Sequence, residues 1–112
     1  MDEVALYGVN HYTLLDHGTI TKGQFSYADL GMDEVPLCEI QGGDAKENAA
    51  ILLSVLRNEP SPFRETTVVN AALGFFAAGK VETIEDGVTL AREVLASGKA
   101  LAVLDKLKEV QV

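Results

Sequence analysis

The chain has 112 residues, 47% of them hydrophobic, and a formal net charge of -8. This length predicts one domain, and the acidic balance without a Lys/Arg cluster argues against nucleic acid, because phosphate backbones attract basic patches. No apolar stretch approaches the about 20 residues needed to cross a bilayer, and the N-terminus lacks a signal-peptide pattern, so we expect no membrane association. Cys38 is the single cysteine. We expect it to be a small buried hydrophobe in a protein of the reducing cytoplasm.

The N-terminal part predicts a β-ribbon. Residues 4–8 (VALYG) and 12–15 are rich in β-forming types, and residues 19–27 (TITKGQFSY) follow an Asp-His-Gly turn. A hairpin with Gly18 at positive φ is therefore expected, with imperfect alternation typical of a partly exposed ribbon. Residues 28–31 predict one helical turn, which ends before Pro36.

Four helices are predicted after Gly42. The first is capped by Asp44 with Glu47 three residues later, and it runs to about Asn58 with an apolar stripe. The second begins with Ser61 as N-cap and Pro62 as first residue. A third, capped by Thr83, spans Ile84–Ala96 with one apolar row facing inward, and a fourth spans Lys99–Val110. The inward row consists of Ile84, Val88, Ala91 and Leu95.

Residues 66–79 (TTVVNAALGFFAAG) are apolar on nearly every side of a helix. Such a helix is expected to be surrounded by other elements, and Asn70 inside it needs a hydrogen-bond partner from a neighbouring segment. A chain of 112 residues covers such a helix with difficulty. We therefore expect that the chain self-associates or is a piece of a larger protein. The predicted fold class is α/β, with an N-terminal β-ribbon followed by about four helices.

Two copies of the tetrapeptide Met-Asp-Glu-Val begin at Met1 and Met32. Paired carboxylates suit Mg²⁺, which takes one or two protein carboxylates and completes its shell with water and phosphates. Adjacent strand residues point to opposite faces, so Asp2 and Glu3 would have to lie on a loop, serve different ions or act through water. By itself, each pair is more typical of solvated surface charge.

Other motifs favour structural roles. Gly42-Gly43-Asp44 is similar to a phosphate-binding loop, but the Asp44 carboxylate would occupy the free N–H groups and repel an anion. His11 and His17 have no partner at metal-ligand spacing, and His17 at a hairpin tip is expected to be exposed. We assign no role to either histidine.

The blocks GGDAKENAAILLSVL, NAALGFFAAGK and IEDGVTLAREVLASGKALAVLDKL strongly resemble the C-terminal part of the anthranilate phosphoribosyltransferase family. The segment MDEVALYGVNHYTLLDHGTITKGQFSYADLGM is similar to the family's metal-binding Asp-Glu pair and the β-ribbon after it. The resemblance covers essentially all of residues 1–112. It implies the C-terminal part of a phosphoribosyltransferase α/β domain similar to nucleoside phosphorylases.

The resemblance implies transfer of a phosphoribosyl group from phosphoribosyl pyrophosphate to anthranilate in tryptophan biosynthesis, with Mg²⁺ bound by Asp2 and Glu3. Asp33 and Glu34 match no family site. The family's donor-binding glycine loop, anthranilate contacts and N-terminal helical domain are expected upstream of Met1. We therefore expect no catalytic or cofactor-binding residue here beyond the metal pair, no activity from the chain alone, and at most a weak Mg²⁺ site at Asp2 and Glu3 in this chain. The alternative is a non-catalytic interaction module that forms a homo-oligomer, or pairs with a complementary chain, through its apolar helix surface.

Overall fold

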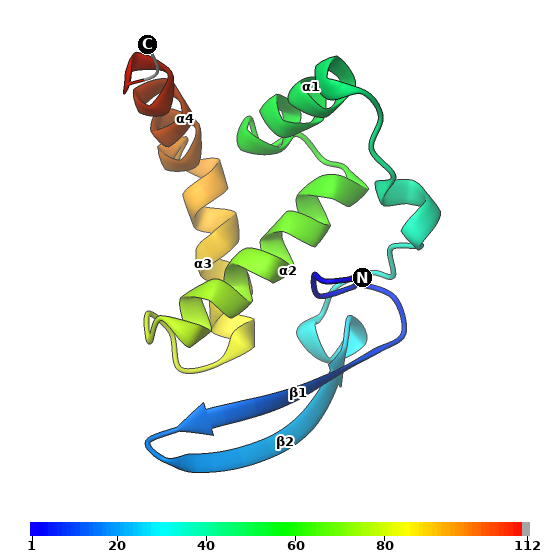
Figure 1. The fold of residues 1–112 in the computed structure, drawn as a ribbon, viewed down its shortest axis with the longest axis vertical. Helices are drawn as coiled ribbons and strands as arrows, with labels where there is room; N and C mark the ends of the chain where they lie inside the picture. The colour runs from blue at the N-terminus through cyan, green and yellow to red at the C-terminus, as the bar shows by residue number, and fades with distance from the viewer. Residues whose placement is uncertain (111–112) are drawn as a thin grey trace.

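The computed structural model describes residues 1–110 and shows a two-stranded antiparallel ribbon followed by four helices, which confirms the predicted fold class (Figure 1). Two 3₁₀ turns, η1 and η2, connect the ribbon to the helices. The elements are β1 Val9–Asp16, β2 Thr19–Ser26, η1 Ala28–Leu30, η2 Leu37–Ile40, α1 Ala45–Leu56, α2 Pro62–Ala77, α3 Ile84–Ala96 and α4 Lys99–Val110. None of the helices within these residues is long and apolar enough to cross a membrane.

The ribbon is a tight hairpin in which β1 and β2 pair from Val9 opposite Ser26 to Asp16 opposite Thr19. The two turn residues both have positive φ, 46° at His17 and 82° at Gly18. Two consecutive positive φ angles give the turn a twist that matches the right-handed twist of the strands. The predicted role of Gly18 is confirmed, and His17 adopts the same left-handed region.

Residues 4–8 are not a strand, so this part of the ribbon prediction is wrong. They run as irregular backbone, and Gly8 at φ 66° redirects the chain into β1. Leu6 is 2% exposed, and its carbonyl oxygen accepts a hydrogen bond of 2.8 Å from the N–H of Val35. Their β-forming composition does not lead to strand pairing here, since strand propensity depends strongly on context.

The helix α2 packs across α3 and forms the centre of the core (Figure 1). Both helices begin as predicted, because the side chains of Ser61 and Thr83 accept hydrogen bonds from backbone N–H groups in the first turn. The two helices approach closely at Gly87, where an added Cβ would lie 2.6 Å from the carbonyl oxygen of Ala72. Three residues of the predicted inward row of α3 are buried and the fourth, Ile84, is partly buried against the core, so that row is confirmed. The buried residues of the two helices are Val68, Val69 and Ala72 from α2 and Gly87, Val88, Ala91 and Leu95 from α3.

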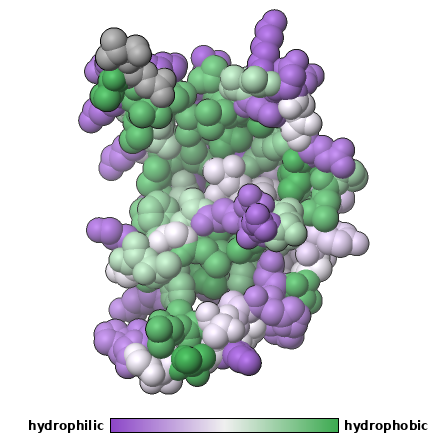
Figure 2. Space-filling view, viewed as in Figure 1, coloured by the Kyte–Doolittle hydropathy of each residue, from purple (hydrophilic) through white to green (hydrophobic). Residues whose placement is uncertain are grey.

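The expectation that α2 is surrounded on every side is wrong within this chain. Thr67, Gly74 and Ala77 are exposed. The helix α1 covers the second side of α2 only loosely: Val55 is its one buried residue, and Leu52 is 49% exposed. Hydrophobic atoms are accordingly widespread on the face that Figure 2 shows.

Two local predictions have opposite outcomes. The cap of α1 is confirmed as a complete capping box, in which Asp44 accepts from the N–H of Glu47 and Glu47 accepts from the N–H of Asp44. The expectation that Cys38 is buried is wrong, because its side chain is exposed in η2. No residue of this four-residue 3₁₀ turn is buried, so the turn lies at the surface and does not enclose the thiol.

Candidate functional site

Asp2 and Glu3 lie on irregular backbone, and both are exposed. On such a loop, adjacent side chains are not forced to opposite faces as they are in a strand, so both carboxylates can serve one metal ion. Figure 1 draws the N-terminal segment next to α2, and Figure 2, in the same view, shows hydrophilic atoms near the middle of this face with hydrophobic atoms around them. The carboxylates are thus accessible from solvent and lie beside the central helix.

Val4, the residue after this pair, is held by the central helix α2. The Oδ1 atom of Asn70 accepts a hydrogen bond of 2.9 Å from the N–H of Val4, and its Nδ2 donates to the Val4 carbonyl oxygen at 3.0 Å. The same Nδ2 donates to the carbonyl oxygen of Thr66 at 2.9 Å. The prediction that Asn70 needs a partner from another segment is therefore confirmed, and the partner is the segment that carries Asp2 and Glu3.

The next residue is held in the same manner by the ribbon. The Oδ1 atom of Asn10 accepts from the N–H of Ala5 at 3.1 Å, and its Nδ2 donates to the Ala5 carbonyl oxygen at 2.8 Å. Together with the Val35 bond to Leu6, backbone groups of three successive residues are fixed directly after the carboxylate pair. The sequence offered a signal for Asn70, as a polar residue in an apolar helix, but none for Asn10.

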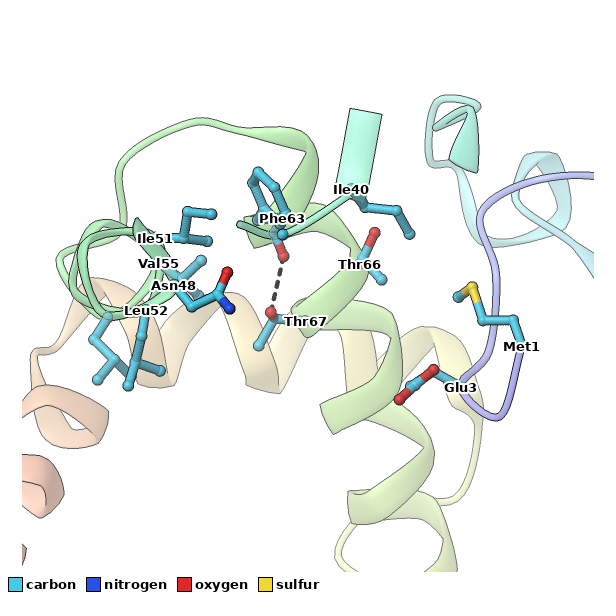
Figure 3. Close-up of a pocket in the computed structure, with 12 residues that line it drawn as sticks. Met1, Glu3, Ile40, Asn48, Ile51, Leu52, Val55, Phe63, Thr66 and Thr67 are labelled. Atoms are coloured by element: carbon cyan, nitrogen blue, oxygen red, sulfur yellow. Dashed lines mark hydrogen bonds between the residues drawn. The ribbon is translucent and has the colours of Figure 1, made fainter. Parts of the chain in front are cut away.

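A cavity of about 470 Å³ opens between the N-terminal segment, α1 and the start of α2 (Figure 3). The side chain of Glu3 lies at its edge. The other lining residues are Met1, Ile40, Gly42, Asn48, Ile51, Leu52, Val55, Leu56, Phe63, Thr66 and Thr67. Most of these side chains are apolar, so the cavity suits an apolar or aromatic group better than a phosphate. The sequence did not predict it, because its walls come from four separate segments.

One polar atom of this cavity differs from the rest. The hydroxyl oxygen of Thr66 is buried and has no hydrogen-bond partner among residues 1–110. A buried hydroxyl without a partner loses the hydrogen bonds that water would give it. The hydroxyl of the neighbouring Thr67, in contrast, donates to the Phe63 carbonyl oxygen at 2.8 Å (Figure 3).

A cluster of charges joins α2 to α3. Arg92 donates to both carboxylate oxygens of Glu65, at 3.1 Å and 2.6 Å, and Arg64 donates to the same carboxylate at 2.9 Å and 3.0 Å. The hydrogen bonds from Arg92, supported by those from Arg64, hold the pKa of Glu65 below its ordinary value against the opposing effect of burial. The carboxylate is thus engaged by two guanidinium groups, and the cluster ties the two helices together.

The start of α1 is occupied by its own side chains. Besides the capping box, the Oδ1 atom of Asn48 accepts from the N–H of Gly43 at 2.9 Å, and its Nδ2 donates to the Gly43 carbonyl oxygen at 3.0 Å. These contacts take the N–H groups that a phosphate would need. The structural interpretation of Gly42-Gly43-Asp44 is therefore confirmed. Asp33, Glu34, His11 and His17 are all exposed, the last as predicted.

The donor set of Asp2 and Glu3 fits one kind of metal site. In the described part of the chain, no group of three or more His, Cys, Asp or Glu side chains is placed to hold an ion. Two adjacent, exposed carboxylates supply only hard oxygen ligands. Mg²⁺ commonly binds through one or two carboxylates and keeps water or phosphate oxygens in its other positions. The pair therefore suits an open Mg²⁺ site that a phosphate-bearing ligand completes.

Comparison with known proteins gives a consistent result. The chain is 63% identical over 112 residues to an anthranilate phosphoribosyltransferase of Streptococcus mutans and 64% identical to that of Streptococcus thermophilus strain LMD-9, covering 100% of this chain in both cases. It spans about a third of the length of these curated relatives, 33% and 34%. The crystal structure of anthranilate phosphoribosyltransferase from Thermus thermophilus matches 95% of this chain and 31% of that one, with a TM-score of 0.82 and 34% identity. The family described as glycosyl transferase family, a/b domain, matches residues 1–101, and the chain therefore belongs to this glycosyl transferase family.

Proposed function

We propose that this chain forms the part of an anthranilate phosphoribosyltransferase that carries its metal-binding carboxylates. The reaction moves a phosphoribosyl group from phosphoribosyl pyrophosphate to the amine of anthranilate, with release of pyrophosphate, in tryptophan biosynthesis. The observation that carries the proposal is identity of 63% and 64% along the whole chain to two enzymes of that name. The single exposed cysteine is compatible with a cytoplasmic protein.

Asp2 and Glu3 are proposed to bind Mg²⁺. When bound, this ion neutralises charge on a leaving diphosphate, which favours departure of that group from the ribose. The carboxylates bind and orient the ion, and their exposure leaves room for water and diphosphate oxygens. The neighbouring cavity, which Glu3 borders, has a mostly apolar lining.

The chain by itself is expected to show no turnover of anthranilate. It spans about a third of the length of its relatives. The start of α1, which follows the Gly-Gly pair, is occupied by side chains rather than open to a phosphate. Detectable consumption of anthranilate by the purified chain would contradict this expectation.

A chimeric enzyme tests the proposed function directly. This chain would replace the segment that it matches in the Streptococcus mutans enzyme, and anthranilate fluorescence would be followed with phosphoribosyl pyrophosphate and Mg²⁺. We expect the fluorescence to fall at a rate within roughly tenfold of the parent, because the segments are 63% identical. A chimera that folds with the parent's unfolding temperature but leaves anthranilate unchanged would refute the proposal.

The second Met-Asp-Glu-Val copy supplies a matched control for the metal pair. The double variant Asp2→Asn/Glu3→Gln removes both carboxylate charges, and Asp33→Asn/Glu34→Gln removes the same charges from the same tetrapeptide elsewhere on the surface. Mn²⁺ replaces Mg²⁺ as a paramagnetic probe. We expect it to broaden amide signals near residues 1–5 in the wild type and the control, and to lose this effect in the first variant. Equal broadening in all three proteins would exclude the pair as the site.

Self-association is a second candidate function, and a specific observation favours it. The cavity beside α1 is open and mostly apolar, and Leu52 at its wall is 49% exposed. Exposed apolar patches of this kind commonly mark contacts with a second copy or a complementary chain. Light scattering on a sizing column, with and without Mg²⁺ and phosphoribosyl pyrophosphate, gives the solution mass. A mass near 12.0 kDa at all concentrations would exclude self-association.

A further inference from the structure

We infer that Asn70 and Asn10 act as positioning residues for the carboxylates of Asp2 and Glu3. The inference rests on the proposed function, because it concerns how the proposed metal pair is held. Its basis is a pair of side-chain amides that grip two consecutive backbone residues, Val4 and Ala5, from two different elements.

Each amide acts like a neighbouring strand. A primary amide presents one acceptor and one donor side by side, and here these pair with the N–H and the C=O of a single backbone residue. The segment after Asp2 and Glu3 has no strand partner within residues 1–110. Asn70 and Asn10 therefore supply the backbone pairing that a sheet would otherwise give it, at the two positions next to the carboxylates.

The amide of Asn70 is itself held in one orientation. Its Nδ2 donates to Thr66 within α2 at 2.9 Å and to Val4 at 3.0 Å, which leaves Oδ1 to accept from the N–H of Val4 at 2.9 Å. The reverse orientation would oppose an amide NH₂ to a backbone N–H. Asn70 thus transmits the position of the central helix, in which Val69 is 0% exposed, to the N-terminal segment.

Asp2 and Glu3 take their position from this anchor. Within residues 1–110, neither takes part in a hydrogen bond or an ion pair with another residue. Consecutive Cα atoms are about 3.8 Å apart, so Glu3 is a single virtual bond from the fixed Val4. Without Asn70 the segment that carries the pair would lose this anchor, and a metal would have to order that segment when it binds.

The test uses the 112-residue chain, whose size of 12.0 kDa suits assignment of single amide signals. Asn70→Ala removes the grip on Val4, and Asn10→Ala independently removes that on Ala5 from the ribbon, outside the helical core. The matched control is Asn48→Ala, which removes the same two-bond grip from Gly43. Asn48 also lines the cavity beside Glu3, but its side chain bonds only to Gly43 and to no residue of the segment that carries Asp2 and Glu3.

Three quantities are measured for each variant: amide hydrogen exchange at residues 4–6, the affinity for Mn²⁺ from signal broadening, and the urea midpoint. We expect exchange at Val4 to rise roughly threefold to tenfold in Asn70→Ala. Mn²⁺ affinity should fall roughly threefold to tenfold in both Asn70→Ala and Asn10→Ala, because part of the binding free energy then goes into ordering the loosened segment. The control Asn48→Ala should change neither the exchange at residues 4–6 nor the Mn²⁺ affinity, although it speeds amide exchange at Gly43. If an asparagine only stabilised the fold, its replacement would lower the urea midpoint but leave the Mn²⁺ affinity unchanged under conditions where the variant is fully folded.

Failure of the inference and failure of the metal proposal are separable. Unchanged exchange at Val4 and Ala5 in the two variants overturns the positioning role, whether or not Mn²⁺ binds. Wild-type affinity for Mn²⁺ in both variants also overturns it. If the wild type shows no broadening near residues 1–5, the proposed metal site is what fails, and the exchange data still decide whether the two asparagines hold the segment.

Discussion

Replacement of Gly87 by alanine tests the close contact between α2 and α3. A Cβ at this position would lie 2.6 Å from the carbonyl oxygen of Ala72 and 3.0 Å from its Cα. Alanine raises helix propensity by about 1 kcal/mol relative to glycine, whereas overpacking in a tight interface costs about 1–3 kcal/mol. The atoms that oppose the new methyl group belong to the backbone and cannot rotate away. We therefore expect the steric cost to lie in the upper part of that range, about 2–3 kcal/mol, which leaves a net loss of about 1–2 kcal/mol in the free energy of unfolding.

The matched control is Gly74→Ala on α2. Gly74 is exposed, and apart from the neighbouring backbone of its own helix no atom lies within 4 Å of an added Cβ. This variant should gain about 0.5–1 kcal/mol, because only the propensity effect remains. Urea unfolding followed by circular dichroism measures both changes, provided that the dependence of the unfolding free energy on urea concentration is the same for each variant. If Gly87→Ala is as stable as the wild type, the two helices adjust at little cost and the reasoning from this contact is refuted.

Three further predictions concern stability. The pKa of Glu65 is lowered, chiefly by its hydrogen bonds to Arg92. The ionised carboxylate should therefore contribute fully to the free energy of unfolding above its ordinary pKa of about 4.3, and this contribution should be lost as the pH falls through the lowered pKa. In urea titrations at decreasing pH, the stability difference between the wild type and Glu65→Gln should shrink. Asp44→Ala should cost about 1 kcal/mol and speed amide exchange in the first turn of α1, whereas unchanged exchange there would argue against the cap. Val69→Ala, at a position 0% exposed, should lower the free energy of unfolding by about 2 kcal/mol, against less than about 0.5 kcal/mol for Val103→Ala, which is 65% exposed.

The helix starts and the hairpin turn could be predicted because their determinants are local. Asp44, Ser61 and Thr83 cap their helices through contacts three residues away, and Gly18 needs only its own positive φ. The apolar row of α3 also follows from spacing alone. Such signals lie within a few residues of the element that they define, so one sequence is sufficient to find them.

The parts that could not be predicted depend on contacts between distant segments. Val4 meets Asn70 across 66 residues, and nothing in residues 4–8 distinguishes a segment gripped by side-chain amides from a strand. The apolar character of α2 suggested cover on all sides, but α1 supplies little of it. Only Asn70 indicated a long-range partner, because a polar residue in an apolar helix must satisfy its amide.

The hairpin has a mechanical consequence. At the tip of the ribbon, Leu15 and Ile20 stand opposite each other and are 68% and 65% exposed, whereas Phe25 near the base is buried. Eight residues of strand extend about 26 Å, so a tilt of about 10° at the base would move the tip by about 5 Å. Such a tilt would turn about the Asn10–Phe25 pair, which lies near the base of the ribbon, and Asn10 also grips Ala5. A change at the apolar tip would therefore reach the segment that carries Asp2 and Glu3 as a rotation of the Asn10 amide.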